Sequence, residues 1–166
     1  NDTDIRIAGN TIFNLYGGTI KTVNYIGIGL YDARNILNVF GGKIENTGGH
    51  ALRGWSTATI NIGTSGDSVS TTIPEIIGKN DAIKTDNGFN FYDGILKGGT
   101  AAIAGTAPIT EPGYAVYTEN SGKTAYLKKD ISITEVTLSG GPFTYDGNAK
   151  KPTPTVKWNG ETLTAG

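Results

Sequence analysis

The chain has 166 residues, of which 25 are glycine, 17% are charged and none is cysteine, and its formal net charge is −1. The lack of cysteine excludes disulfide bonds and thiolate metal ligands, and the lack of a concentrated positive charge excludes nucleic-acid binding. No stretch approaches about 18 consecutive apolar residues, so no membrane insertion is predicted within the chain. Frequent glycine and asparagine, together with β-branched and aromatic residues, predict an all-β chain with many turns.

An internal repeat occupies most of the first 128 residues. Its strongest form places asparagine between two hydrophobic residues, and its copies start at Phe13, Leu37, Ile60 and Phe89. A second motif, in which a small residue precedes an aliphatic one, alternates with the first and lies at 29–31, 51–53, 82–84 and 115–117. Two motifs that alternate in this way indicate a coil in which each rung, meaning one circuit of the chain, carries both.

Each copy of the first motif has the pattern of a short β-strand. Hydrophobic residues alternate with asparagine, which is the period of two of a strand, and Gly-Gly pairs at 17–18 and 41–42 allow a tight bend afterwards. Strands this short bury their apolar side only when rungs stack at a spacing of about 4.8 Å. We therefore expect a parallel β-helix at residues 1–128, with loops at 64–75 and 104–113 that leave the coil.

The repeat resembles the glycine-rich repeats of parallel β-helices in very large surface proteins of Gram-positive bacteria. In that family strands of the type L-x-I-x-G-G-x-I recur, as in LNVFGGKI at 37–44, and the resemblance covers about residues 5–128. It implies a right-handed, single-stranded parallel β-helix of about 4–5 rungs.

Composition changes after Lys128-Lys129, and residues 129–166 form a second region. Its segment TYDGNAKKPTPTV at 144–156 is similar to the opening half of Ig-like β-sandwich modules in bacterial cell-wall proteins. A complete sandwich needs about seven strands and about 100 residues, and this region has room for only part of one. The resemblance therefore implies an incomplete Ig-like β module, which could cap the last rung of the β-helix.

Residues that alternate with the core side chains should form columns on the outside of the coil. One column carries asparagine amides, which can hydrogen-bond from rung to rung. Its members are Asn14, Asn38, Asn61 and Asn90. The neighbouring column contains Tyr16, Phe40, Gly63 and Tyr92. Its rings are candidate ligand-binding groups because aromatic faces match the apolar faces of sugars, although a loop or the C-terminal region could cover them instead.

A second candidate binding surface follows the small-aliphatic motif. Its members are Tyr31, Arg53, Lys84 and Tyr117, with Trp55 and His50 nearby. A further column of alternating charge contains Lys21, Glu45 and Lys97. We interpret this last column as structural, with ion pairs that contribute about 0.2–1 kcal/mol each.

The sequence offers little support for catalysis. Its single histidine, His50, lies in a Gly-Gly-His turn, and no G-x-S-x-G motif is present. Three aspartates near Lys79 and Lys84 occupy turn positions, where aspartate commonly serves the backbone. They are Asp81, Asp86 and Asp93. We therefore predict no catalytic residues, no metal site and no cofactor.

These expectations lead to one preferred function and two alternatives. The preferred one is a non-enzymatic structural or adhesive segment of a secreted bacterial cell-surface or cell-wall protein, acting as a rigid spacer or a display face. The first alternative is a glycan-binding module whose aromatic column contacts host or environmental glycans, or extracellular proteins. The second is a truncated β-helix polysaccharide lyase or glycosidase. The surface location and the Gram-positive origin are implied by the resemblance alone.

Overall fold

The computed structural model describes residues 2–55, 57–66, 73–129, 135–139, 146–149, 153–158 and 161–163. The regular elements among them are β-strands, and the chain divides into two compact units, Asn1–Lys128 and Lys129–Gly166. Within the described ranges, no helix has the length and hydropathy of a membrane-spanning segment. The predicted all-β class is confirmed for this part of the chain.

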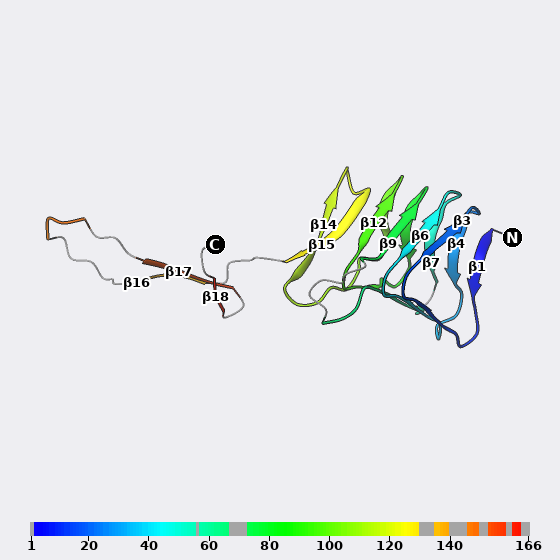
Figure 1. Cartoon of the computed structure of the whole chain (residues 1–166), viewed down its shortest axis with the longest axis horizontal. Helices are drawn as coiled ribbons and strands as arrows, with labels where there is room; N and C mark the ends of the chain where they lie inside the picture. Colours follow the sequence, from blue (N-terminus) through cyan, green and yellow to red (C-terminus); the bar gives the residue numbers. More distant parts are fainter. Residues whose placement is uncertain are drawn as a thin grey trace. The chain divides into compact units, whose positions relative to one another are not determined.

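Three sheets, here called faces A, B and C, build the first unit (Figure 1). Face A contains β1 (Thr3–Ile7), β4 (Ile26–Leu30), β7 (His50–Gly54), β10 (Asp81–Thr85) and β13 (Ala101–Gly105). Face B contains β2 (Ile12–Leu15), β5 (Ile36–Val39), β8 (Thr59–Ile62) and β11 (Asn90–Phe91). Face C contains β3 (Thr19–Thr22), β6 (Lys43–Asn46), β9 (Glu75–Gly78), β12 (Ile95–Gly98), β15 (Thr124–Lys129) and β14 (Tyr114–Glu119). From β1 to β13, neighbours on a face are parallel and three strands apart in sequence, so the chain circles a common core about four times. The predicted parallel β-solenoid is confirmed.

Side chains that alternate with the asparagines fill the core between the faces. On face B, Leu37, Val39, Ile60, Ile62 and Phe91 are each at most 1% exposed. Pairing of β5 with β8 places Leu37 on Ile60 and Val39 on Ile62, so the same inward position recurs from rung to rung. Each such burial contributes about 1.5–3 kcal/mol relative to exposure. The inward direction predicted from the period of two is confirmed.

The small-aliphatic motif marks a place on face A where this alternation is interrupted. Ala51 and Leu52 are adjacent, yet both are fully buried, and the same holds for Ala82 and Ile83. The first residue of the pair must be small because rungs approach closely here. The predicted copy at 29–31 is wrong by two residues, because pairing of β4 with β7 aligns Gly27, and not Gly29, with Ala51. A Cβ at Gly27 would lie 2.7 Å from the Ala51 carbonyl oxygen. The motif therefore fills a tight corner of the coil.

The two ends of the solenoid differ. At the N-terminal end the edge strands leave Ile12, Tyr16 and Val23 exposed by 60%, 72% and 69%. At the other end β15 pairs antiparallel with β12, and Ala125 is buried against the core. The hairpin of β14 and β15 thus covers the last rung of face C. The expectation that residues 115–117 continue the series of face A is wrong, because they lie in β14 and the fifth strand of face A is β13.

The described part of the second unit is an antiparallel sheet of β16 (Glu135–Ser139), β17 (Thr153–Trp158) and β18 (Glu161–Leu163), in that order. The backbone N–H of Asn148 donates to Asp146 Oδ1 at 3.0 Å, and Gly147 has a φ of 82°. Both features belong to a turn after the predicted Tyr-Asp motif, of which Tyr145 lies outside the described residues. The Ig-like assignment of this unit stays a prediction.

Candidate functional site

The asparagine column on face B forms a continuous ladder of side-chain hydrogen bonds. Asn38 Nδ2 donates to Asn14 Oδ1, Asn61 Nδ2 donates to Asn38 Oδ1, and Asn90 Nδ2 donates to Asn61 Oδ1, each at 2.7 Å. Parallel pairing in register brings each amide directly over the next, so one donor and one acceptor are used at every internal position. The structural role predicted for this column is confirmed.

The neighbouring aromatic column is broken into two parts. Tyr16 and Phe40 stack with ring centroids 5.0 Å apart and an interplanar angle of 22°. The next rung carries Gly63, where a Cβ would lie 2.4 Å from the backbone nitrogen of Asp93. Tyr92 lies beyond that gap, on the fourth rung, and is partly buried. The continuous aromatic surface that the sequence suggests is therefore reduced to one stacked pair and a separate tyrosine.

Arginine and aromatic side chains form a second stack, on the outside of face A. The rings of Tyr31 and Trp55 lie 4.4 Å apart at 26°, the Arg6 guanidinium lies 4.2 Å from the Tyr31 ring centre, and that of Arg53 lies 4.8 Å from the Trp55 ring centre. Gly29 makes room for the rings, since a Cβ there would lie 2.8 Å from Tyr31 and 3.2 Å from Trp55. We call these four side chains the arginine–aromatic stack.

Hydrogen bonds hold two members of the arginine–aromatic stack, Arg53 and Tyr31, in place. Arg53 donates to both carboxylate oxygens of Asp86, at 2.9 and 3.0 Å, and Thr3 Oγ1 lies 2.5 Å from the Tyr31 hydroxyl. Each ring contacts the other ring and one guanidinium group. Part of the surface of both rings is thus used for contacts within the protein, and both rings are only partly exposed, unlike Tyr16.

Sequence reasoning found three of the four members of this stack and missed Arg6. Pairing of β1 with β4 and of β4 with β7 aligns Arg6, Gly29 and Arg53 on one exterior position. Only the register between rungs reveals this alignment, because Arg6 lies outside every copy of the motif. Tyr117, which we predicted on the same surface, lies on β14, where Lys128 Nζ is 4.6 Å from its ring centre.

His50 is buried in face A rather than exposed in a turn. Its Nδ1 lies 2.8 Å from Asp81 Oδ2, although no well-aligned hydrogen bond satisfies Nδ1, and the Tyr25 ring meets the imidazole edge-on at 4.9 Å. Burial lowers the pKa of His50 from its ordinary value of 6.5, and the charge of Asp81 opposes this effect only in part. The neutral imidazole therefore belongs to the packing of the first unit.

The three aspartates that we considered for catalysis have separate partners. Asp81 faces His50, Asp86 binds Arg53, and Asp93 accepts a 2.8 Å hydrogen bond from the backbone of Gly94 through Oδ1. The Asp93 Oδ2 atom is buried without a hydrogen-bond partner. Within the described ranges, no group of three or more His, Cys, Asp or Glu side chains is arranged to hold a metal ion.

Ion pairs on face C are arranged differently from the predicted column. Glu75 accepts from Lys97 Nζ at 2.6 Å and lies 3.7 Å from Lys43 Nζ, which also pairs with Glu45 at 3.3 Å. The hydrogen bond from Lys97 is the main reason that the pKa of Glu75 is lowered. Lys21 lies beside Glu45 in register, but these two side chains form no ion pair in the described structure.

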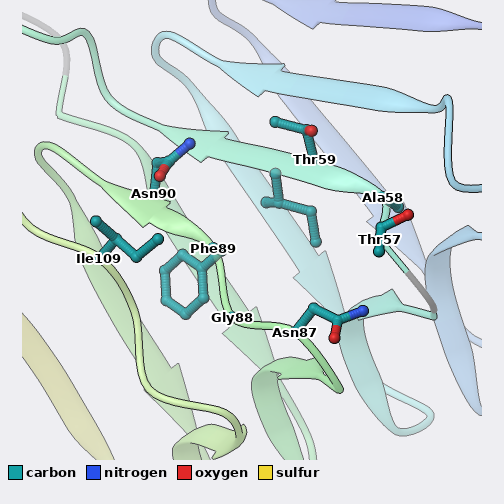
Figure 2. A pocket seen from close by; sticks show the side chains of 9 residues that line it. Thr57, Ala58, Thr59, Asn87, Gly88, Phe89, Asn90 and Ile109 are labelled. Carbon is teal, nitrogen blue, oxygen red and sulfur yellow. The ribbon is translucent and has the colours of Figure 1, made fainter.

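A hollow of about 300 Å³ opens between the third and fourth rungs at the edge of face B (Figure 2). Residues 57–60 line one side, residues 87–90 line the other, and Ile109 lies at its border. None of these residues is charged. No short sequence pattern indicates this hollow, because it arises from the place at which β11 begins.

Comparison of the chain with protein-family models, with curated proteins and with solved structures gave no match.

Proposed function

We propose that residues 1–128 form a rigid, non-enzymatic spacer or display segment of a secreted bacterial cell-surface protein. The observation that carries the proposal is that side chains tie the rungs together along every face. Amides do so on face B, rings and guanidinium groups on face A, and ion pairs on face C. Such ties add to the backbone pairing between rungs and favour a stiff coil. The right-handed coil, the Gram-positive origin and an Ig-like continuation belong to this proposal and come from the sequence resemblance.

Hydrogen exchange of backbone amides in the folded protein tests the spacer role. We expect slow and similar exchange for the strands of the second and third rungs, β4 to β9, because each of them lies between two neighbouring strands, of which only β11 is short and pairs with half of β8. The edge strands β1 to β3 are the internal reference and should exchange faster. If the second and third rungs exchange as fast as the edge strands, a rigid spacer is contradicted.

Glycan binding by the aromatic column is a second candidate function. Tyr16 stacks on Phe40 and is 72% exposed, so it keeps an open ring surface of the kind that packs on sugars. The partners of such a surface would be host or environmental glycans, or extracellular proteins. This candidate adds recognition to the spacer role and does not replace it.

An array of glycans and extracellular-matrix proteins tests this second candidate. Wild type is compared with a Tyr16→Ala/Tyr92→Ala double variant whose circular dichroism and unfolding midpoint match the wild type. Val23→Ala is the matched control, because Val23 is also exposed, at 69%, and carries no ring. Binding that is lost only in the tyrosine variant supports the aromatic column. Binding that persists in that variant removes this column from consideration.

A further inference from the structure

The hollow in Figure 2 exists because the ladder of face B is interrupted between its last two strands. β2, β5 and β8 each have four residues, whereas β11 has two and pairs with β8 only at Asn61 and Ile62. The first half of β8 therefore has no strand partner on the side of the fourth rung. Figure 2 shows residues 57–59 and 87–90 facing one another across this opening.

A change of hydrogen-bond partner at Gly88 explains the interruption. In the second and third rungs, the backbone N–H at this position bonds to the rung before, from Ile36 to Thr11 O at 2.9 Å and from Thr59 to Asn35 O at 3.0 Å. In the fourth rung, Gly88 N instead donates to Thr85 Oγ1 at 2.6 Å, and Thr85 Oγ1 donates back to Gly88 O at 3.0 Å. The Thr85 side chain thus holds this corner away from the third rung.

This change leaves a set of neutral polar groups without protein partners around the hollow. The Ala58 carbonyl oxygen is in the position that would accept from Gly88, and none of the described residues donates to it. Within the same ranges, no hydrogen bond involves the hydroxyl groups of Thr57 and Thr59 or the side-chain amide of Asn87. Unused donors and acceptors therefore gather at one place on a rigid scaffold.

The composition of the lining selects the class of ligand. The absence of charged side chains in the lining disfavours a phosphate, a uronate or an ammonium group, whereas hydroxyl and amide groups match ligands that both donate and accept. Ile109, which is 64% exposed, adds apolar contact at the border. A volume of about 300 Å³ lies at the lower limit for ligand pockets and suits one small ring.

We propose that this opening binds one neutral sugar unit of a glycan, with Thr57, Thr59, Asn87 and the Ala58 carbonyl oxygen as its hydrogen-bonding groups. A ligand of this size should bind with a Kd on the order of 1 mM, so useful avidity would need several sites or a long glycan. The inference does not rest on the spacer role, and it assigns glycan recognition to a place other than the aromatic column.

Saturation-transfer NMR with defined sugars tests the proposal. The neutral probes are maltose, cellobiose, lactose and N,N′-diacetylchitobiose, and digalacturonic acid is the charged comparison. An Asn87→Ala/Thr57→Val variant removes two unpaired exposed groups at the opening and should weaken binding by about tenfold or more. The matched control is Asn10→Ala/Thr64→Val, which makes the same chemical changes at exposed positions elsewhere.

Three results decide between the possibilities. Transfer to a neutral sugar that persists in the control and in Tyr16→Ala, and is lost in the variant of the opening, supports the site. Transfer that is lost in Tyr16→Ala and kept in the variant of the opening overturns it in favour of the aromatic column. No transfer to any neutral probe, or equal transfer to digalacturonic acid, also overturns it and leaves the spacer proposal to its own test by hydrogen exchange.

Discussion

The asparagine ladder allows a prediction of stability from position alone. Asn61 is internal and makes two amide–amide hydrogen bonds, whereas Asn14 is terminal and makes one. A net contribution of about 0.5–1.5 kcal/mol per hydrogen bond predicts that Asn61→Ala lowers the free energy of unfolding by about 1–3 kcal/mol. Asn14→Ala should cost about half as much or less, because its single bond lies at an exposed end.

A charge-changing variant sharpens this prediction. In Asn61→Asp the carboxylate still accepts from Asn90 but cannot donate to Asn38, so two oxygens face each other at neutral pH. The variant should be at least as unstable as Asn61→Ala at pH 7 and should recover in part when acid protonates the new carboxyl group. Urea unfolding followed by circular dichroism measures all three variants, with constant m-values as the check that the denatured state is unchanged. Equal losses at Asn61 and Asn14, or no recovery in acid, would refute the reasoning.

Three further predictions concern faces A and C and the corners between rungs. Arg53→Ala removes the bidentate pair with Asp86 and the contact with the indole ring, so it should lower the free energy of unfolding by about 1 kcal/mol, and Arg53→Lys should recover only part of this loss. Gly48→Ala would place a Cβ 2.0 Å from a backbone carbonyl oxygen of the preceding rung, so it should lower the free energy of unfolding by about 3 kcal/mol or more. Gly17→Ala is the control, because a Cβ there has nothing within 4 Å, and the same urea titration should show almost no change. Burial lowers the pKa of His50 in the folded state, so the unfolded chain binds the proton more tightly. The stability that neutral His50 contributes should therefore be fully present above pH 6.5, its ordinary pKa, and should be lost as the pH falls below that value. His50→Gln should flatten the dependence of the free energy of unfolding on pH between pH 7 and pH 5. A slope that is unchanged in that variant would assign the effect to carboxyl groups instead.

Much of the solenoid could be predicted because short sequence patterns specify the strands and bends of each rung. The alternation of asparagine with hydrophobic residues decides which side of a short strand is inward, and glycine pairs decide where the chain bends. Repetition at a similar spacing then aligns equivalent residues from rung to rung, which is why the bonds between Asn14, Asn38 and Asn61 were foreseeable. When the rungs of such a repeat stack in parallel, equivalent residues of neighbouring rungs lie next to each other.

Other features could not be predicted because they depend on partners from another rung. The small-aliphatic copy at 115–117 has the local pattern of face A, yet it lies in an antiparallel strand, since alternating residues fit either kind of pairing. Arg6 contacts Tyr31 across one rung without belonging to any repeat. The opening beside Ala58 arises because Thr85 Oγ1 forms two hydrogen bonds with the backbone of Gly88, and no short sequence pattern predicts these bonds.

The sequence by itself determined the strands of face B, their inward and outward sides and the asparagine ladder, because these follow from residue alternation within a few positions. Only the tertiary structure decided which exterior side chains remain exposed and which exterior polar groups lack a hydrogen-bond partner within the protein. The rings of Tyr31 and Trp55 stack on each other and contact guanidinium groups, Tyr16 keeps an exposed ring, and neutral polar groups are left unpaired beside Ala58. The physical reason is that exposure and hydrogen-bond satisfaction depend on all the atoms around a side chain, and most of those atoms belong to other rungs.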